Sequence, residues 1–149
     1  MDLPALTDDV GYLLSRTSGI TARAANTALA GYGLRVRQYS VLSLAADAPD
    51  GLSQRELAGV LGLDPSQVVL LVDELADAGL VLRRPCPGDR RARLVVATDE
   101  GRRVLGGARR QAHDGVRHQL RALSDREQET LRDLLARVVR SAGGVSVGR

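Results

Sequence analysis

The stretch SQRELAGVLGLDPSQVVLLVDELADAGL, residues 53–80, contains two helix-start signals in close succession. In the first, Ser53 is followed three residues later by Glu56, a capping box in which each side chain satisfies an otherwise unpaired backbone N–H. In the second, Asp64 stands directly before Pro65, so that an acidic N-cap precedes a proline at the first helical position. The stretch therefore predicts two short helices joined by a turn of only a few residues.

The chain after the second helix predicts a β-hairpin with a basic tip. The helix is expected to end at Gly79, a candidate C-cap, and residues 80–82 and 94–96 are short β-prone runs. Residues 83–93 between them contain two prolines and a glycine, so we expect a long basic loop there. Two short helices followed by such a hairpin are the layout of a winged helix-turn-helix, in which the second helix enters the DNA major groove.

Further helices are expected on the N-terminal side of this module. From Leu3 to Leu29 the apolar positions recur at spacings of three and four, which predicts one long amphipathic helix. A second helix is expected from about Val36 to Ala46, before the helix-breaking residues 48–51. The core that these helices enclose must be aliphatic, because the chain has no Phe and no Trp.

Two more helices are expected on the C-terminal side of the hairpin. Thr98 is a candidate N-cap followed by two acidic residues, which complement the positive end of the helix dipole, and this helix is expected to reach about Leu123. A capping box from Ser124 to Glu127 begins the last helix. The predicted fold class is mainly α with a small β-hairpin wing.

Composition and charge narrow the class of protein. All 21 basic residues are arginine, and the formal net charge is +3. This balance favours a polyanionic partner, although a GC-rich genome would also supply arginine in place of lysine. Cys86 is the only cysteine, so no intrachain disulfide can form and we expect a cytoplasmic protein. No leader is evident, and no apolar run approaches the roughly 18 residues of a membrane span.

The N-terminal, outward-facing positions of the second helix are the candidates for reading DNA bases. Gln67 could form a bidentate pair with adenine, and Ser66 can bond a phosphate or a base. An apolar side chain, Val69 or Leu70, can touch a thymine methyl group. The acidic residues at 73, 74 and 77 would repel phosphates, so we expect that half of the helix to point away from the DNA.

The basic segment 83–93 is the second candidate DNA contact. Arginine suits insertion into a narrow minor groove, and Asp89 could hold a neighbouring guanidinium in position. The alternative is a solvated charged loop. The full set of DNA-binding candidates is Ser53, Gln54, Ser66, Gln67, Val69, Leu70, Arg84, Asp89, Arg90, Arg91 and Arg93.

Several short motifs resemble the MarR family of bacterial transcription regulators, and the flanking helices extend the resemblance over nearly the whole chain. The motifs are SQRELA (53–58), LDPS (63–66), LVDEL (71–75), GLV (79–81), GDRR (88–91) and DEG (99–101). The resemblance implies a homodimer that binds a pseudo-palindromic operator in double-stranded DNA, as a repressor that a small aromatic or phenolic effector releases. Many relatives carry a polar residue and an arginine where this chain has Val69 and Leu70, so more of the affinity is expected from the wing.

The resemblance also divides the chain into parts. We expect an N-terminal dimerisation helix (1–34), a winged helix-turn-helix DNA-binding module (35–98), C-terminal dimerisation helices (99–142) and a frayed tail (143–149). The expected dimer interface consists of two apolar stripes, with Leu3, Leu6, Val10 and Leu13 in one and Leu131, Leu134, Leu135 and Val138 in the other. The alternative is that both stripes close the core of a single protomer.

For the effector the candidates are Tyr12, Arg16 and Tyr39, which could stack on and neutralise an aromatic acid, but each could equally be a core or surface residue.

Other chemistry finds little support in the sequence. His113 and His118 are five positions apart, about 140° around a helix, so a metal pair is not expected. No cofactor or nucleotide motif and no catalytic constellation is present, so we expect no cofactor and no enzyme. Two alternatives stay open: a redox switch at Cys86, whose pKa nearby arginines could lower, and a protein-interaction module, which the acidic residues and Leu70 would suit.

Overall fold

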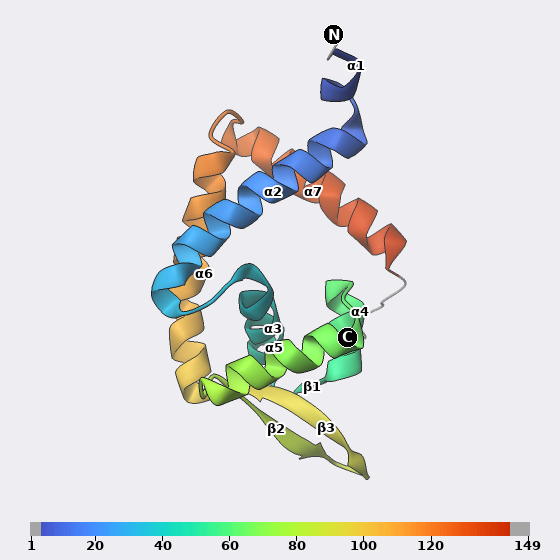
Figure 1. Ribbon diagram of the computed structural model, residues 1–149, viewed down its shortest axis with the longest axis vertical. Coiled ribbons are helices and arrows are strands. Elements are labelled where there is room, and N and C mark those ends of the chain that lie inside the picture. The colour runs from blue at the N-terminus through green and yellow to red at the C-terminus, as the bar shows by residue number, and fades with distance from the viewer. Residues whose placement is uncertain (1–3, 144–149) are drawn as a thin grey trace.

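The computed structural model describes residues 4–143 and consists mainly of helices, with a small antiparallel sheet at one end of the molecule (Figure 1). The helices are α1 (Pro4–Thr7), α2 (Val10–Leu29), α3 (Val36–Asp47), α4 (Gln54–Leu61), α5 (Pro65–Asp77), α6 (Asp99–Gln119) and α7 (Asp125–Ala142), with a 3-10 turn, η1, at Ala30–Tyr32. The strands are β1 (Leu52–Ser53), β2 (Val81–Cys86) and β3 (Asp89–Ala97), in the order β1-β3-β2. The predicted fold class is confirmed.

The two helix-start signals produce α4 and α5 as expected. Ser53 Oγ accepts a hydrogen bond from the N–H of Glu56 at 3.2 Å, and Glu56 Oε2 accepts one from the N–H of Ser53 at 2.8 Å. Helix α4 ends at Gly62, whose φ of 62° lies in the left-handed region that favours glycine. Asp64 then caps α5 by accepting the N–H of Ser66 at 2.9 Å. The helix-turn-helix is confirmed.

The hairpin differs from the long basic loop expected over 83–93. Strands β2 and β3 continue until only Pro87 and Gly88 separate them, so the arginines of this segment stand on a paired ribbon. Pro85 does not interrupt β2 because β2 is the edge strand, where a proline is tolerated. Strand β1 was not predicted at all; its two residues pair with β3, Leu52 opposite Val95.

The single N-terminal helix expected from Leu3 to Leu29 is interrupted. Helices α1 and α2 are separated at residues 8 and 9, where the Asp9 side chain accepts the N–H of Tyr12 at 2.8 Å and so starts a new helix. The apolar spacing continues across this break, which is why periodicity alone did not reveal it. Leu3 lies outside the described residues.

The C-terminal helices follow the prediction with one difference. Helix α6 ends at Gln119 rather than near Leu123, because residues 120–123 form the turn into α7. Helix α7 begins at the predicted capping box, in which Glu127 accepts the N–H of Ser124 at 2.8 Å. The tail beyond Gly143 lies outside the described residues.

The core is aliphatic, as expected. Its largest fully buried side chains come from α2, α3, α4, α5 and β3: Leu29, Leu42, Leu57, Leu75, Val41, Val68, Val72 and Val95. The two apolar stripes of α2 and α7 do not join this core, since Val10 is 68% and Val138 is 61% exposed. The alternative that both stripes close the core of one protomer is therefore wrong.

Candidate nucleic-acid interface

The first turn of α5 is built around the carboxylate of Asp64. Ser66 donates its hydroxyl to Asp64 Oδ1 at 2.6 Å and its backbone N–H to the same oxygen at 2.9 Å. The side-chain hydrogen bond from Ser66 holds the pKa of the Asp64 carboxyl below its usual range. Because Asp64 is then an anion that only accepts, Ser66 must be the donor, and the free lone pairs of its hydroxyl oxygen face solvent as an acceptor.

The rest of the outer surface of α5 is apolar near its start and acidic further on. Leu70 is 64% exposed and Val69 is 36% exposed, without a basic side chain beside them on the helix. Gln67 folds back so that its Oε1 accepts the N–H of Asp64 at 3.3 Å, which leaves its amide nitrogen as a donor. The exposed apolar pair and one amide are thus the groups with which α5 can meet a ligand.

The acidic side chains of α5 are held by neighbours. Asp73 accepts a hydrogen bond from Arg83 Nη2 at 2.6 Å, and Glu74 accepts one from Gln38 Nε2 at 2.6 Å. Arg35 lies 3.9 Å from Glu74. These contacts draw negative charge toward α3 and β2, away from the exposed start of α5.

Two of the predicted DNA contacts are occupied inside the protein. Gln54 Oε1 accepts both Nε and Nη2 of Arg83, at 3.0 and 2.9 Å, so Arg83 joins α4, α5 and β2. Arg84 donates to the carbonyl oxygens of Pro49 and Asp50 at 3.3 and 3.0 Å. Arg83 therefore braces the hairpin against α4 and α5, and Arg84 braces it against the turn between α3 and β1.

The free cations lie further out on the hairpin. Arg90 and Arg91 are exposed, and within residues 4–143 neither guanidinium makes a hydrogen bond or ion pair. The prediction that Asp89 holds a guanidinium is wrong: within residues 4–143 no arginine side chain pairs with Asp89, whose Oδ1 accepts the backbone N–H of Arg91 at 2.9 Å. Arg93 instead donates to the carbonyl oxygen of Arg90 at 2.9 Å. Among the described residues, the hairpin tip thus presents two positive charges without a partner.

Two hollows adjoin these elements. The first, of about 590 Å³, lies between α2, α3 and α5 and is lined by Arg35, Arg37, Leu70 and Leu71 among others. Sequence reasoning did not single out Arg37, which is exposed and lines the same hollow as Gln67 and Leu70, two of the predicted DNA contacts. The second, of about 770 Å³, is almost wholly apolar and lies between α2, α6 and α7.

Comparison with known proteins places the chain in a family. The sequence profile of the MarR family matches residues 32–92. A MarR-family transcriptional regulator from Rhodococcus sp. RHA1 is 44% identical, with a TM-score of 0.87 over 91% of this chain and 96% of that one. CouR from Rhodococcus jostii RHA1, solved with p-coumaroyl-CoA, is 45% identical, with a TM-score of 0.82 over 91% and 95%. A CouR repressor bound to a 23-mer DNA duplex is 30% identical, with a TM-score of 0.83 over 94% and 99%.

The chain belongs to the MarR family. The motifs that suggested this membership are the ones that build the helix-turn-helix and the hairpin of the structure. The matched proteins are transcriptional regulators, and one of them, a CouR repressor, was solved with a DNA duplex bound. Over residues 4–143, no three His, Cys, Asp or Glu side chains gather as metal ligands would, and no helix there has the length and apolar character needed to cross a membrane.

The three predicted effector residues are not brought together in this MarR-family chain. Tyr12 and Arg16 lie on α2, and neither lines either hollow. Tyr39 packs against the core and lies beside Arg109, on α6. Cys86 is half-buried on β2, with its sulfur 3.6 Å from the carbonyl oxygen of Pro87. Their roles as effector or redox residues stay predictions.

Proposed function

We propose that this MarR-family chain is a homodimeric transcription regulator that binds a specific pseudo-palindromic site in double-stranded DNA and acts as a repressor in the cytoplasm, without catalytic activity. The observation that carries the proposal is the pair of exposed guanidiniums, Arg90 and Arg91, which have no partner within residues 4–143. They project beside a helix-turn-helix whose second helix has no acidic residue in its first turn after the N-cap Asp64. The duplex-bound CouR neighbour supports the same function.

Helix α5 and the hairpin contact two neighbouring grooves of the DNA. Helix α5 enters the major groove with Ser66, Gln67 and Leu70 toward the base edges, and the hairpin places Arg90 or Arg91 in the adjacent minor groove. Residues 35–98 thus serve as the DNA-binding module. Gln54 and Arg84 contribute by bracing this module, and Arg83 acts with them.

The apolar stripe that runs from α1 into α2 and the apolar stripe on α7 supply the dimer contact. Leu6 and Leu13 on one side and Leu134 and Val138 on the other are between 46% and 61% exposed in the single chain. Apolar surface of this extent is stabilised by burial against a second copy, and a two-fold dimer spaces two reading helices by about 34 Å, one turn of DNA. Residues 4–34 and 99–142 thus form the dimerisation region.

The effector that fits best is the coenzyme A thioester of an aromatic acid. The hollow between α2, α3 and α5 combines cationic Arg35 and Arg37, suited to phosphates, with apolar Leu70 and Leu71, suited to an acyl group. The p-coumaroyl-CoA complex of CouR supports this class. A ligand there would lie against the reading helix, which explains how it would weaken DNA binding.

Fluorescence anisotropy tests the proposal. We expect one duplex from the DNA flanking the gene to bind at least about a thousandfold more tightly than an unrelated duplex of equal length. Saturating p-coumaroyl-CoA should weaken that binding by about five- to 150-fold, with p-coumarate and coenzyme A as separate controls. Equal binding to all duplexes would contradict the proposal. It would favour a protein partner that contacts Leu70, because α5 has no basic residue.

The hydrogen bonding of Ser66 makes a prediction about sequence preference. Since its hydroxyl proton is committed to Asp64, Ser66 should accept from the amino group of adenine or cytosine and not donate to a phosphate. Ser66→Ala removes one acceptor and is therefore expected to lose about 0.5–1.5 kcal/mol of discrimination at one base pair of each half-site while keeping the salt dependence of binding. Selection of bound duplexes from a random library measures this, and an unaltered base preference would refute the acceptor role.

A further inference from the structure

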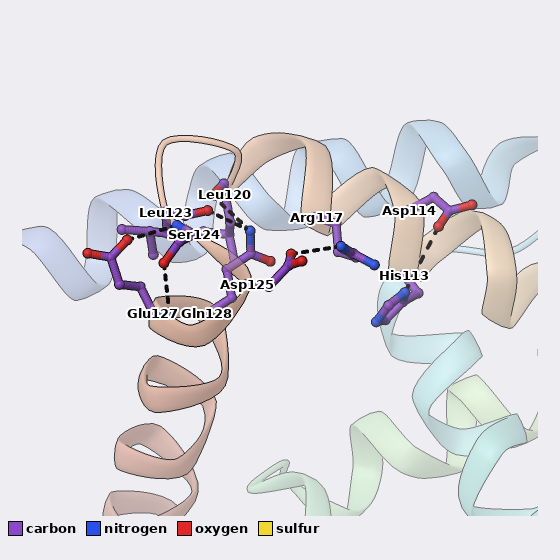
Figure 2. A network of polar contacts seen from close by, with 9 residues as sticks. All are labelled: His113, Asp114, Arg117, Leu120, Leu123, Ser124, Asp125, Glu127 and Gln128. Atoms are coloured by element: carbon purple, nitrogen blue, oxygen red, sulfur yellow. Dashed lines mark hydrogen bonds and ion pairs between the residues drawn. The ribbon is translucent and has the colours of Figure 1, made fainter.

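The elbow between α6 and α7 is closed by the side chain of Gln128 (Figure 2). Its Nε2 donates to the carbonyl oxygens of both Leu120 and Leu123, each at 3.1 Å. The Leu120 carbonyl oxygen also accepts the backbone N–H of Leu123 at 2.9 Å, so Gln128 ties a turn that is already hydrogen-bonded to the first turn of α7 and thereby fixes the angle between the two helices. Gln128 is half-buried in this position.

Two further contacts support the same elbow. Arg117 on α6 pairs with Asp125 on α7 at 2.9 Å, and both are well exposed. Ser124 and Glu127 form the capping box that starts α7, and the hydrogen bonds from Ser124 hold the pKa of Glu127 below its usual range. The exposed pair contributes little by itself. The two bonds of Gln128 are the partly buried contact that spans the turn.

Beyond the elbow α7 has little to hold its direction. None of its residues is buried, and its apolar residues Leu134, Val138 and Val139 are at least half exposed. Leu131 and Leu135 line the apolar hollow with residues of α2 and α6, but that hollow is open space in the single chain. The direction of α7 therefore depends strongly on the elbow.

The other end of α6 is fixed to the DNA-binding module. Arg109 holds both carboxylate oxygens of Asp47 at 2.7 and 2.8 Å, and Arg102 donates to the carbonyl oxygen of Ala46 at 2.8 Å. Figure 1 shows α6 running from this elbow down to the sheet. A change of angle at the elbow is thus transmitted through α6 to the reading helix and the hairpin.

We infer that Gln128 is a positioning residue for DNA recognition: by locking the α6–α7 elbow it sets the distance between the two hairpins of the dimer. This inference rests on the proposed dimeric function. Helix α6 has 21 residues, which makes a lever about 31 Å long. A rotation of about 10° at the elbow would move its far end by about 5 Å, more than the 3.4 Å or so between successive base pairs.

The natural cysteine allows a direct test. Cys86 is the only cysteine and lies on the hairpin, so one spin label per chain reports the distance between the two hairpins by pulsed electron resonance, without DNA. We expect one narrow distance distribution for the parent protein. Gln128→Met, which removes the donor, and Gln128→Glu, which turns a carboxylate toward two carbonyls, should shift or broaden it by about 5 Å or more. Gln128→Lys restores a donor and should keep the narrow distribution.

Controls separate geometry from folding and from the proposed function. Glu129→Gln changes the neighbouring exposed residue and should leave the distribution as in the parent. Circular dichroism checks that each variant is helical. The Met and Glu variants should also distinguish less than the parent between duplexes whose half-sites differ in spacing by one base pair. Identical narrow distributions for parent, Met and Glu variants would overturn the inference alone. A parent without any interspin distance would overturn the dimer as well.

Discussion

Gly101→Ala is expected to lower the free energy of unfolding by more than about 3 kcal/mol, and the melting temperature by about 10 °C or more. Gly101 is buried in the first turn of α6, where a Cβ would overlap the carbonyl oxygen of Leu80 and come within 3.1 Å of Leu42 Cδ1. That carbonyl oxygen already accepts the N–H of Thr98 at 3.0 Å, and Thr98 also caps α6. The backbone at this crossing cannot withdraw without breaking the start of α6.

A matched glycine on the same helix gives the control. Gly106 has nothing within 4 Å of an added Cβ, so Gly106→Ala should stabilise the protein by about 0.5–1 kcal/mol through the lower entropy of the unfolded chain. Thermal and urea unfolding of both variants, followed by circular dichroism, measures the difference. Similar melting temperatures for the two variants would contradict the close packing of α6 on the start of β2.

Local chemistry explains which parts of the fold were readable from sequence. The capping boxes at Ser53 and Ser124 and the N-cap Asp64 act over two or three residues, so their signals survive in the sequence and fixed the helix starts correctly. Asp9 also caps a helix, but the apolar spacing continued across it and concealed the break. Pro85 looked like a breaker because its tolerance depends on β2 lying at an edge, which is a property of the sheet.

The roles of the arginines needed the structure. Arg83 finds Gln54 29 positions away, and Arg84 finds the carbonyl oxygen of Asp50 34 positions away, so no local pattern separates these braces from the free Arg90 and Arg91. Counting charges in the sequence therefore located the basic hairpin. It did not show which of its arginines are paired within the protein and which are free. In the fold, Arg83 and Arg84 are hydrogen-bonded to distant parts of the chain, whereas Arg90 and Arg91 near the tip are exposed.

Replacing both free hairpin arginines, Arg90→Ala with Arg91→Ala, should weaken DNA binding by about a hundred- to a thousandfold at moderate salt. A dimer loses four guanidiniums, and a contribution of about 0.7–1 kcal/mol from each gives a loss of this size. Because the contacts are electrostatic, the loss should apply to specific and unrelated duplexes alike, and the slope of log affinity against log salt should fall by about two for each arginine removed from both chains.

The control must remove the same charge elsewhere. Arg110 and Arg126 are exposed on α6 and α7, and within the described chain neither side chain has a hydrogen bond or ion pair, so the double variant Arg110→Ala with Arg126→Ala matches the change in net charge. Arg126 lies in the first turn of α7, and Figure 1 shows that α7 starts at the elbow with α6, away from the hairpin. Anisotropy titrations at several salt concentrations compare the two double variants. If both lose affinity equally, net charge and not the hairpin determines binding, and the assignment of Arg90 and Arg91 to the minor groove fails. If only the hairpin variant loses affinity and has a smaller slope of log affinity against log salt, the two free guanidiniums contact the phosphates and the minor groove. The exposed start of α5 cannot supply such contacts, because it has no basic side chain.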